Sequence, residues 1–475
     1  MNNKKKILSM LLVIFFILPI TSTIPADYST TPSSAKQTAD WTVMYYLCCD
    51  NHISYEGEGI VTNLTMVGSS NNFNLIVLKD GDKDGDSVLY YVEEGNAVSL
   101  NDVYSWPDEL DMANPNTIKL FIELVMDEYP ANHYALIMLS DHGSGWQGVC
   151  YDRSVENRGY TVIPMPIFAN ALKEVTSYSG KKIDIIGFMP CVTGMFEVAY
   201  ELAPYADYMV ASEEHMLEDL DNGPEYTWQY LQSTWNLKNN TGMTPEQFAG
   251  SIVDYYKSCD FPLWILYSYM VITKQREYGK IVEVISDILT KAVNKFRNPE
   301  FRIVALHTTL SAVNLSKIND VGGKINNLSS LLILHGQNYQ IKQAIQLARK
   351  NVREYGKFYT KKSSTLIYYI NFPIEKLAFD SFVDLYDIIQ RINETAENQL
   401  VKDACLQLMK EIEDSIILNK AMQNDESHGL SIYFPENNKL YNKYLWGEEI
   451  PSPYEDLRFS KDTMWDEFLK GYLKV

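Results

Sequence analysis

The alternation of short apolar runs with helical patterns through the first half of the chain constrains the fold more than any other feature. His133–Leu139 and Lys182–Phe188 are almost continuously apolar, as strands are when both faces of a parallel sheet are covered. Asn114 and Pro115 are typical first residues of a helix, which we expect to end near Glu128. Repeated strand, helix and strand predict a mostly parallel α/β sheet with right-handed crossovers. The expected strands are Trp41–Leu47, Phe73–Lys79, Ser87–Val92, His133–Leu139, Lys182–Phe188 and Asp207–Ala211, and two further helices are expected at 166–176 and 195–202.

The second half of the chain is less regular, and no internal repeat is evident. We interpret residues 40–250 as the α/β core and residues 251–475 as a C-terminal α/β extension that adds strands and covering helices. Helices are expected at Thr244–Lys257, Glu277–Lys295, Asp380–Ile392 and Asn398–Leu418, and strands at Leu263–Tyr267, Thr365–Ile370 and Leu430–Phe434.

Residues 1–26 have the pattern of a secretory signal peptide. Three lysines, at positions 4 to 6, precede the apolar run Ile7–Ile20, which is short for a membrane-spanning helix. Residues 27–39 are rich in Ser, Thr and Pro and are interpreted as a linker. We therefore expect a secreted or cell-surface protein that contacts the membrane only if the signal segment stays uncleaved.

Charge and cysteine content exclude two further classes of protein. The formal net charge of −20 repels nucleic acid, so no nucleic-acid partner is expected. Six cysteines in 475 residues are too few for a disulfide scaffold, and no two have the CxxC spacing typical of zinc sites. A cysteine of an exported chain is therefore expected to be buried, paired or reactive.

Two of the predicted strands are followed by residues suited to nucleophilic catalysis. His142 follows the strand that ends at Leu139, and Cys191 follows the strand that ends at Phe188. Open parallel sheets form their binding crevices at the carboxyl ends of their strands. An imidazole beside a thiol takes its proton and later protonates the leaving amine. The pattern predicts a cysteine peptidase with Cys191 as nucleophile and His142 as general base, a pair that requires no cofactor for its chemistry.

The oxyanion of such a reaction needs hydrogen-bond donors, for which the backbone N–H groups of Gly143 and Cys191 are the candidates. The structural alternative is that Cys191 is a small buried hydrophobe, as most lone cysteines are. A second candidate base is His428, but it precedes a predicted strand instead of following one.

Seven short stretches stand in order along the chain: Trp41–Tyr46, Leu110–Thr117, Asp141–Trp146, Ile183–Cys191, Val210–Glu214, Thr309–Lys317 and His428–Pro435. Together they resemble the clostripain family of cysteine peptidases, within the caspase–gingipain–legumain clan. The resemblance extends from about residue 40 to residue 472. It implies a caspase-like α/β fold and hydrolysis of peptide or protein substrates. It also implies a dyad of His142 and Cys191, with a structural role for His428.

One position departs from the pattern of that family. The resemblance implies an Asp two residues before the nucleophile, where it helps to select Arg or Lys as the P1 residue, but this chain has Met189 there. A thioether cannot pair with a guanidinium, and an unpaired buried cation is unfavourable. Either P1 is uncharged, or Asp219 and Asp221 of a nearby acidic stretch supply the carboxylate. A catalytically inactive or binding protein on a peptidase fold is the competing interpretation.

A run of alternating aspartates provides a candidate calcium site. Asp80, Asp82, Asp84 and Asp86 surround two glycines and match the first half of an EF-hand loop, whose oxygen ligands bind Ca²⁺. The twelfth position of such a loop is a Glu, but here it is Tyr91, and predicted strands flank the run. A solvated hairpin turn is therefore the alternative to a site for this possible Ca²⁺ cofactor.

Overall fold

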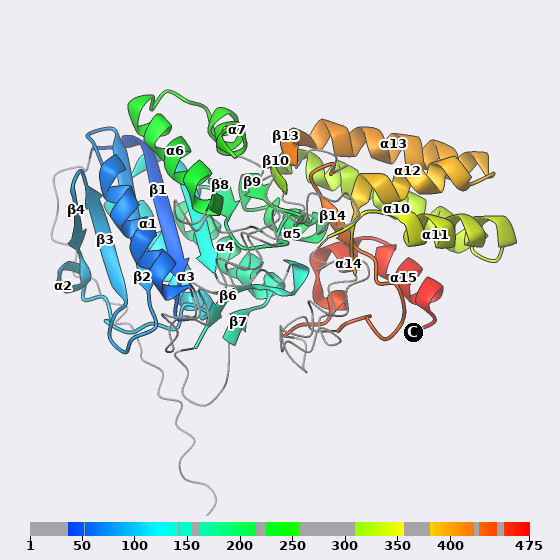
Figure 1. Cartoon of the computed structure of the whole chain (residues 1–475), viewed down its shortest axis with the longest axis horizontal. Coiled ribbons are helices and arrows are strands. Elements are labelled where there is room, and N and C mark those ends of the chain that lie inside the picture. Colours follow the sequence, from blue (N-terminus) through cyan, green and yellow to red (C-terminus); the bar gives the residue numbers. More distant parts are fainter. Residues whose placement is uncertain are drawn as a thin grey trace, which may run out of the picture. The chain divides into compact units, whose positions relative to one another are not determined.

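A nine-stranded sheet forms the centre of the computed structural model (Figure 1). Its strand order is β13-β10-β9-β8-β5-β1-β2-β3-β4, in which β9, β8, β5, β1 and β2 run parallel and the outer strands run antiparallel to their neighbours. The predicted mostly parallel α/β sheet is thus confirmed. The strands are β1 Ala39–Cys48, β2 Phe73–Asp80, β3 Val88–Glu93, β4 Asn96–Ser99, β5 Ala131–Ser140, β8 Ile183–Phe188, β9 Ala206–Ala211, β10 Thr309–Asn314 and β13 Ile416–Ala421.

The structure describes residues 37–51, 53–140, 143, 145–153, 161–214, 216, 225–256, 309–355, 381–421, 427–443 and 451–475. The predicted signal peptide, most of the linker, the helix Glu277–Lys295 and the strands Leu263–Tyr267 and Thr365–Ile370 lie outside these residues. None of the described helices is both long enough and apolar enough to span a bilayer.

Helices cover both faces of the sheet, and this explains why the sequence of β1 is mostly apolar. Trp41, Val43 and Tyr45 pack into one hydrophobic cluster, whereas Met44 and Tyr46 pack into the other. Successive side chains of a strand point to opposite faces, so a strand covered on both sides has no polar face. The first cluster includes α1 Ser54–Val67, α6 Glu225–Asn239 and α7 Pro245–Tyr255, and the second includes α3 Pro115–Glu128, α4 Met165–Ser179 and α5 Phe196–Leu202.

The C-terminal part of the chain extends the same sheet through β10 and β13 and adds further helices (Figure 1). A small sheet of order β11-β12-β14 is joined to the segment that follows β8, where the Ser431 backbone N–H donates to the Gly194 carbonyl at 2.9 Å. A two-stranded ribbon, β6-β7, completes the strands. The remaining elements are β6 Val149–Asp152, β7 Thr161–Ile163, β11 Glu354–Tyr355, β12 Phe382–Asp384, β14 Ser431–Tyr433, α2 Asn101–Tyr104, α10 Ile318–His335, α11 Tyr339–Asn351, α12 Leu385–Thr395, α13 Gln399–Ser415, α14 Arg458–Asp462, α15 Trp465–Leu473 and the short 3-10 helices η1 Gly145–Gln147, η2 Leu315–Lys317 and η5 Tyr454–Asp456.

Two predicted helices differ from the structure at their ends. The helix expected from Asp380 begins only at Leu385, because Asp384 accepts a hydrogen bond from the Asp387 N–H and caps it, and the preceding residues form β12. The helix expected to reach Leu418 ends at Ser415, after which β13 pairs with β10.

Candidate active site

The carboxyl ends of β5 and β8 lie side by side at one edge of the sheet. Their register pairs Met138 with Phe188, and the Met189 N–H then donates to the Met138 carbonyl at 2.9 Å. The segments that come after Ser140 and Phe188 therefore leave the sheet together. His142, the predicted general base, lies outside the described residues, but its neighbour Gly143 is described.

Gly143 brings the segment after β5 into direct contact with the segment after β8. A Cβ atom placed on Gly143 would lie 1.4 Å from the Cys191 carbonyl oxygen, a distance that no side chain can occupy. Only glycine permits such a close approach of two backbones. The structure thus brings the residue after His142 against the backbone of Cys191, although the two residues are 48 positions apart in the sequence.

Cys191 is partly exposed, unlike the other described cysteines, which are Cys48, Cys49, Cys150 and Cys405. The Met216 N–H donates a hydrogen bond to its Sγ at 3.2 Å, and a donor aimed at sulfur favours the anionic thiolate. By contrast, burial raises the pKa of the Cys405 thiol to about 12, so this cysteine stays protonated. Burial likewise raises the pKa of Cys48 well above its ordinary value. Its exposure therefore distinguishes Cys191 as the accessible thiol among the described cysteines.

The turn that carries Cys191 has an unusual backbone. Val192 has φ of 51°, in a region that a β-branched residue rarely adopts. Hydrogen bonds to the segment after β9 hold this conformation. The Val192 N–H donates to the Glu214 carbonyl at 3.1 Å, and the Gly194 N–H donates to the Ser212 carbonyl at 2.7 Å. The position of the thiol is therefore set by neighbouring chain segments rather than by local preference.

Met189 lies in an apolar environment. Its side chain is 2% exposed and borders a small cavity whose other lining residues come from β1, α1 and α6. Those residues are Tyr45, Ile60, Asn63, Leu64 and Leu231. Asp219 and Asp221, the alternative carboxylates for a P1 pocket, lie outside the described residues.

Comparison with known proteins identifies the family. A profile of the clostripain family matches residues 45–472, nearly the whole chain. The chain belongs to the clostripain family. It is therefore a cysteine-type endopeptidase that acts on peptide or protein substrates, and the resemblance noted in its sequence is confirmed.

The relatives of this clostripain-family chain have diverged far in sequence. Clostripain from Hathewaya histolytica is 23% identical over an alignment that covers 89% of this chain and 80% of the relative. An inactive zymogen C11 protease from Parabacteroides distasonis has a similar fold, with a TM-score of 0.55, 17% identity, and coverage of 91% of this chain and 99% of the other. A secreted C11 cysteine protease from Bacteroides thetaiotaomicron, bound to an irreversible peptide inhibitor, also has a similar fold. Its TM-score is 0.51 and its sequence identity is 16%, and the comparison covers 86% of this chain and 97% of the other.

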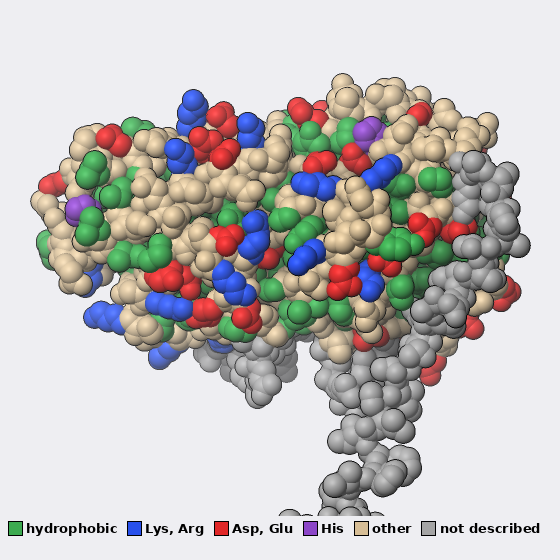
Figure 2. All heavy atoms as spheres, turned by 180° about the vertical axis from the view of Figure 1, so that it is seen from behind, with side chains coloured by type: hydrophobic (Ala, Val, Ile, Leu, Met, Phe, Trp, Pro, Cys, Tyr) green, Lys and Arg blue, Asp and Glu red, His purple; other side chains and the backbone are tan. Residues whose placement is uncertain are grey.

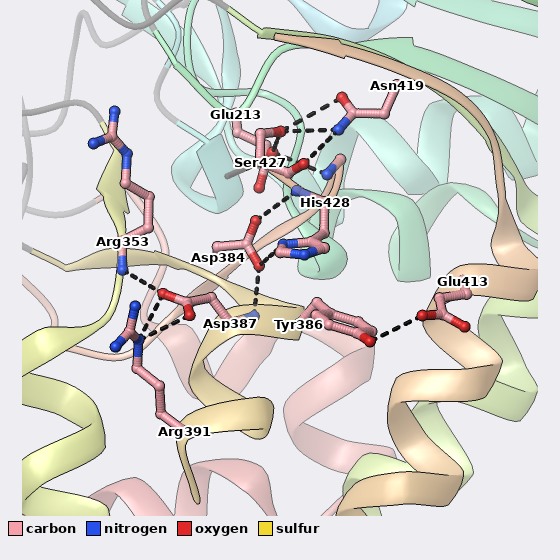
Figure 3. A network of polar contacts seen from close by, with 11 residues as sticks. Glu213, Arg353, Asp384, Tyr386, Asp387, Arg391, Glu413, Asn419, Ser427 and His428 are labelled. Atoms are coloured by element: carbon pink, nitrogen blue, oxygen red, sulfur yellow. Dashed lines mark hydrogen bonds and ion pairs between the residues drawn. The ribbon is translucent and has the colours of Figure 1, made fainter. Parts of the chain in front are cut away.

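The alternative candidate base, His428, is held in a polar network that connects β12 and α12 to the segment before β14 (Figure 3). Its Nδ1 lies 3.1 Å from Oδ1 of the buried Asp384, and its backbone N–H donates to Oδ2 of the same residue at 2.8 Å. The imidazole stacks on Tyr386, with ring centroids 4.2 Å apart. Burial raises the pKa of the Asp384 carboxyl, and the hydrogen bond from His428 opposes that rise. These contacts give His428 a role in joining the C-terminal elements.

The aspartate run is the turn between β2 and β3, and the structure separates its members. Asp82 and Asp84 are exposed, and Asp82 accepts a hydrogen bond from the Ser54 hydroxyl at 2.8 Å. Asp86 accepts one from the Gly81 N–H at 2.8 Å. Only Asp80 is fully buried, and its carboxylate lies beside two others that the sequence interpretation missed, those of Asp50 and Asp152.

A signal for these two aspartates was present in the sequence. Asp50 lies two residues after the end of β1 and Asp80 ends β2, so both lie at the carboxyl edge where the site residues were expected. Burial raises the pKa of Asp80 to about 8 and that of Asp50 to about 6, and in both cases the Asp152 carboxylate adds to the rise.

On the face drawn in Figure 2, acidic and basic side chains are interspersed. The net negative charge of the chain is therefore not gathered into one patch on that face.

Proposed function

We propose that this peptidase cleaves peptide bonds with a dyad of Cys191 and His142. The contact between Gly143 and the Cys191 carbonyl carries this proposal, because it puts the neighbour of His142 against the nucleophile. His142 removes the thiol proton, and the thiolate attacks the substrate carbonyl. The backbone N–H groups of Gly143 and Cys191 then stabilise the oxyanion.

The rest of the cycle uses the same two side chains. The C–N bond breaks as His142 returns its proton to the leaving amine, which leaves a thioester on Cys191. A water molecule, deprotonated by His142, attacks this thioester and releases the acid and the free thiol. The thiol and the imidazole supply both the nucleophile and the base, so the chemistry itself needs no cofactor.

The test is the kinetics of Cys191→Ala and His142→Ala on a peptide substrate. We expect each variant to lose activity, by at least about a thousandfold, because general acid–base and nucleophilic catalysis are removed. His428→Ala serves as the control and is expected to keep activity if it folds, as judged by circular dichroism. Normal turnover by Cys191→Ala contradicts the assignment, and an inactive parent protein would favour the competing interpretation of a binding protein on this fold.

We also propose that the P1 residue is apolar or uncharged. Met189 stands where the family resemblance implies a carboxylate, and the side chains around it are mostly apolar. The described residues that line the cavity beside Met189 include no carboxylate to pair with a cation. We therefore expect kcat/KM for Lys or Arg at P1 to be lower than for Leu or Met by about tenfold or more. A P1-diverse fluorogenic library measures this ratio. A strong preference for Arg would contradict the proposal and implicate Asp219 or Asp221.

The protein is further proposed to be exported through its N-terminal 26 residues, with membrane attachment only if that segment is retained. Its acidic character disfavours a nucleic-acid partner. Cell fractionation combined with N-terminal sequencing tests export. Retention of the whole protein in the cytosol with an intact N-terminus would contradict it.

A further inference from the structure

We propose that Asp50, Asp80 and Asp152 bind a hard divalent cation, for which Ca²⁺ is the best fit. The three residues come from different parts of the chain: the segment after β1, the end of β2 and the end of β6. One carboxylate oxygen of each lies within 4.8 Å of the others, and all three residues are buried. This site differs from the alternating aspartate run, with which it shares only Asp80.

Asp80 has an oxygen that protein groups do not satisfy. Its side chain is fully buried, and Oδ1 accepts a hydrogen bond from the Ser87 hydroxyl. Oδ2 is also buried, and no hydrogen-bond donor reaches it among the described residues. A buried carboxylate oxygen without a partner is strongly unfavourable, and a bound cation would satisfy it.

The charges around the three carboxylates also favour a cation. Lys79 adjoins Asp80 in the sequence, but strand alternation turns it to the other face, where its Nζ lies 2.5 Å from Glu58. Three carboxylates this close together repel one another when ionised, and a bound divalent cation would offset that repulsion.

Backbone and side-chain hydrogen bonds hold the three aspartates in place. The Met112 N–H donates to Asp152 Oδ2 at 2.7 Å and fixes that carboxylate. The Cys49 N–H donates to the Asp80 carbonyl at 3.1 Å, and the Arg153 N–H donates to the Asp50 carbonyl at 3.2 Å. Such outer contacts orient ligands before a metal arrives.

The ligand chemistry selects among metals. All three donors are carboxylate oxygens, which suit Ca²⁺ and Mg²⁺ rather than Zn²⁺ or Cu²⁺. The donors come from three separate segments without a regular loop. Ca²⁺ accepts variable geometry and six to eight oxygen ligands, whereas Mg²⁺ demands a near-ideal octahedron. Ca²⁺ is therefore expected to bind more tightly than Mg²⁺.

A contact connects this cation site to the strand that precedes His142. Tyr151, next to Asp152, donates its N–H to the hydroxyl of Ser140, the last residue of β5. The Tyr151 carbonyl accepts a hydrogen bond from the side-chain amide of Asn51, next to Asp50, at 2.9 Å. Binding of Ca²⁺ is therefore expected to stabilise this edge of the sheet as well as the aspartates themselves.

The experiment is isothermal titration of the full-length Cys191→Ala protein, freed of metal with EGTA, with CaCl₂ and with MgCl₂, together with thermal unfolding. The inactive background makes the result independent of the proposed dyad. One Ca²⁺ site and a Ca²⁺-dependent rise in Tm are expected. Asp80→Asn is expected to weaken Ca²⁺ binding at least about tenfold, since it removes the charge of a central ligand.

Asp82→Asn and Asp84→Asn are the matched controls, because they remove the same charge from exposed positions of the same turn. They are expected to retain Ca²⁺ affinity. The proposal is overturned if Ca²⁺ does not bind or if Asp80→Asn binds Ca²⁺ as tightly as the parent. It is also overturned if the two controls lose Ca²⁺ affinity instead. Tighter binding of Mg²⁺ than of Ca²⁺ would overturn the choice of metal. If Asp80→Asn does not fold, Asp50→Asn is read by the same criteria.

Discussion

At the scale of single residues, Gly143 is a position where the site has no room for a side chain. We expect Gly143→Ala to lower kcat/KM by about a hundredfold, because its Cβ would lie 1.4 Å from the Cys191 carbonyl oxygen and one of the two segments must move. Peptide hydrolysis measures the loss, and circular dichroism checks the fold. The matched control is Gly59→Ala in α1, where a Cβ meets nothing within 4 Å, so activity should be retained. An unaltered kcat/KM in Gly143→Ala would show that the segments do not meet as described.

The position of Cys191 could be predicted from the sequence, but one of its main contacts could not. The sequence singled out Cys191 by its place after a strand, and the structure shows that it is the accessible thiol among the described cysteines. The donor at Met216 could not be predicted, because it lies 25 residues away on a segment that comes after another strand. Such a contact depends on how β8 and β9 are placed side by side.

At the scale of elements, Glu197 joins α5 to β14 and to η5. Its Oε1 accepts hydrogen bonds from the Tyr433 N–H at 2.8 Å and from the Tyr454 hydroxyl at 2.7 Å. Complete burial nevertheless raises the pKa of this carboxyl to about 7. In the unfolded chain a glutamate has a pKa of about 4.3. Between these two values the native state binds more protons than the unfolded state, so stability falls as pH rises through this window.

Glu197 is therefore expected to make the stability of the protein depend on pH. Below about pH 4.3 the carboxyl is protonated in both the folded and the unfolded state and does not change stability, whereas above pH 7 its burial as an anion lowers stability by up to about 4 kcal/mol. Glu197→Gln should therefore reduce the loss of stability between pH 5 and pH 8, since an amide does not ionise. Urea unfolding of both proteins across this range measures the effect. The exposed Glu394→Gln is the control, and the idea fails if both variants keep the slope of the parent.

Element ends show where local sequence rules hold and where they do not. Asn114 and Pro115 begin α3 as their residue types predict, because a cap and a fixed φ act within one turn. The helical pattern that predicts a helix as far as Leu418 is wrong beyond Ser415, because Ile416–Ala421 forms β13. This strand conformation arises from pairing with β10, about a hundred residues earlier, and pairing over that distance overrides a local helical pattern.

At the scale of the whole molecule, the two halves of the sequence share one sheet. β10 and β13 come from the C-terminal part and lie beyond β9 in the strand order. Residues 36–475 form one compact unit, so the site at the carboxyl edge rests on a sheet that both halves build. Ser427 and Gly429, near the C-terminus, both donate hydrogen bonds to the Glu213 carboxylate, two residues after β9 (Figure 3). These contacts connect the distant part of the chain to the segment that holds Val192.

The sequence by itself determined the parallel sheet, the edge at which Cys191 and Gly143 lie, and the family. These depend on apolar periodicity, capping residues and ordered motifs, all of which act over short stretches of chain. Only the tertiary structure decided the burial of Met189, the pairing of β13 with β10 and the meeting of Asp50, Asp80 and Asp152. Burial and ligand geometry depend on which segments pack together, and packing joins residues whose separation in the sequence carries no local signal.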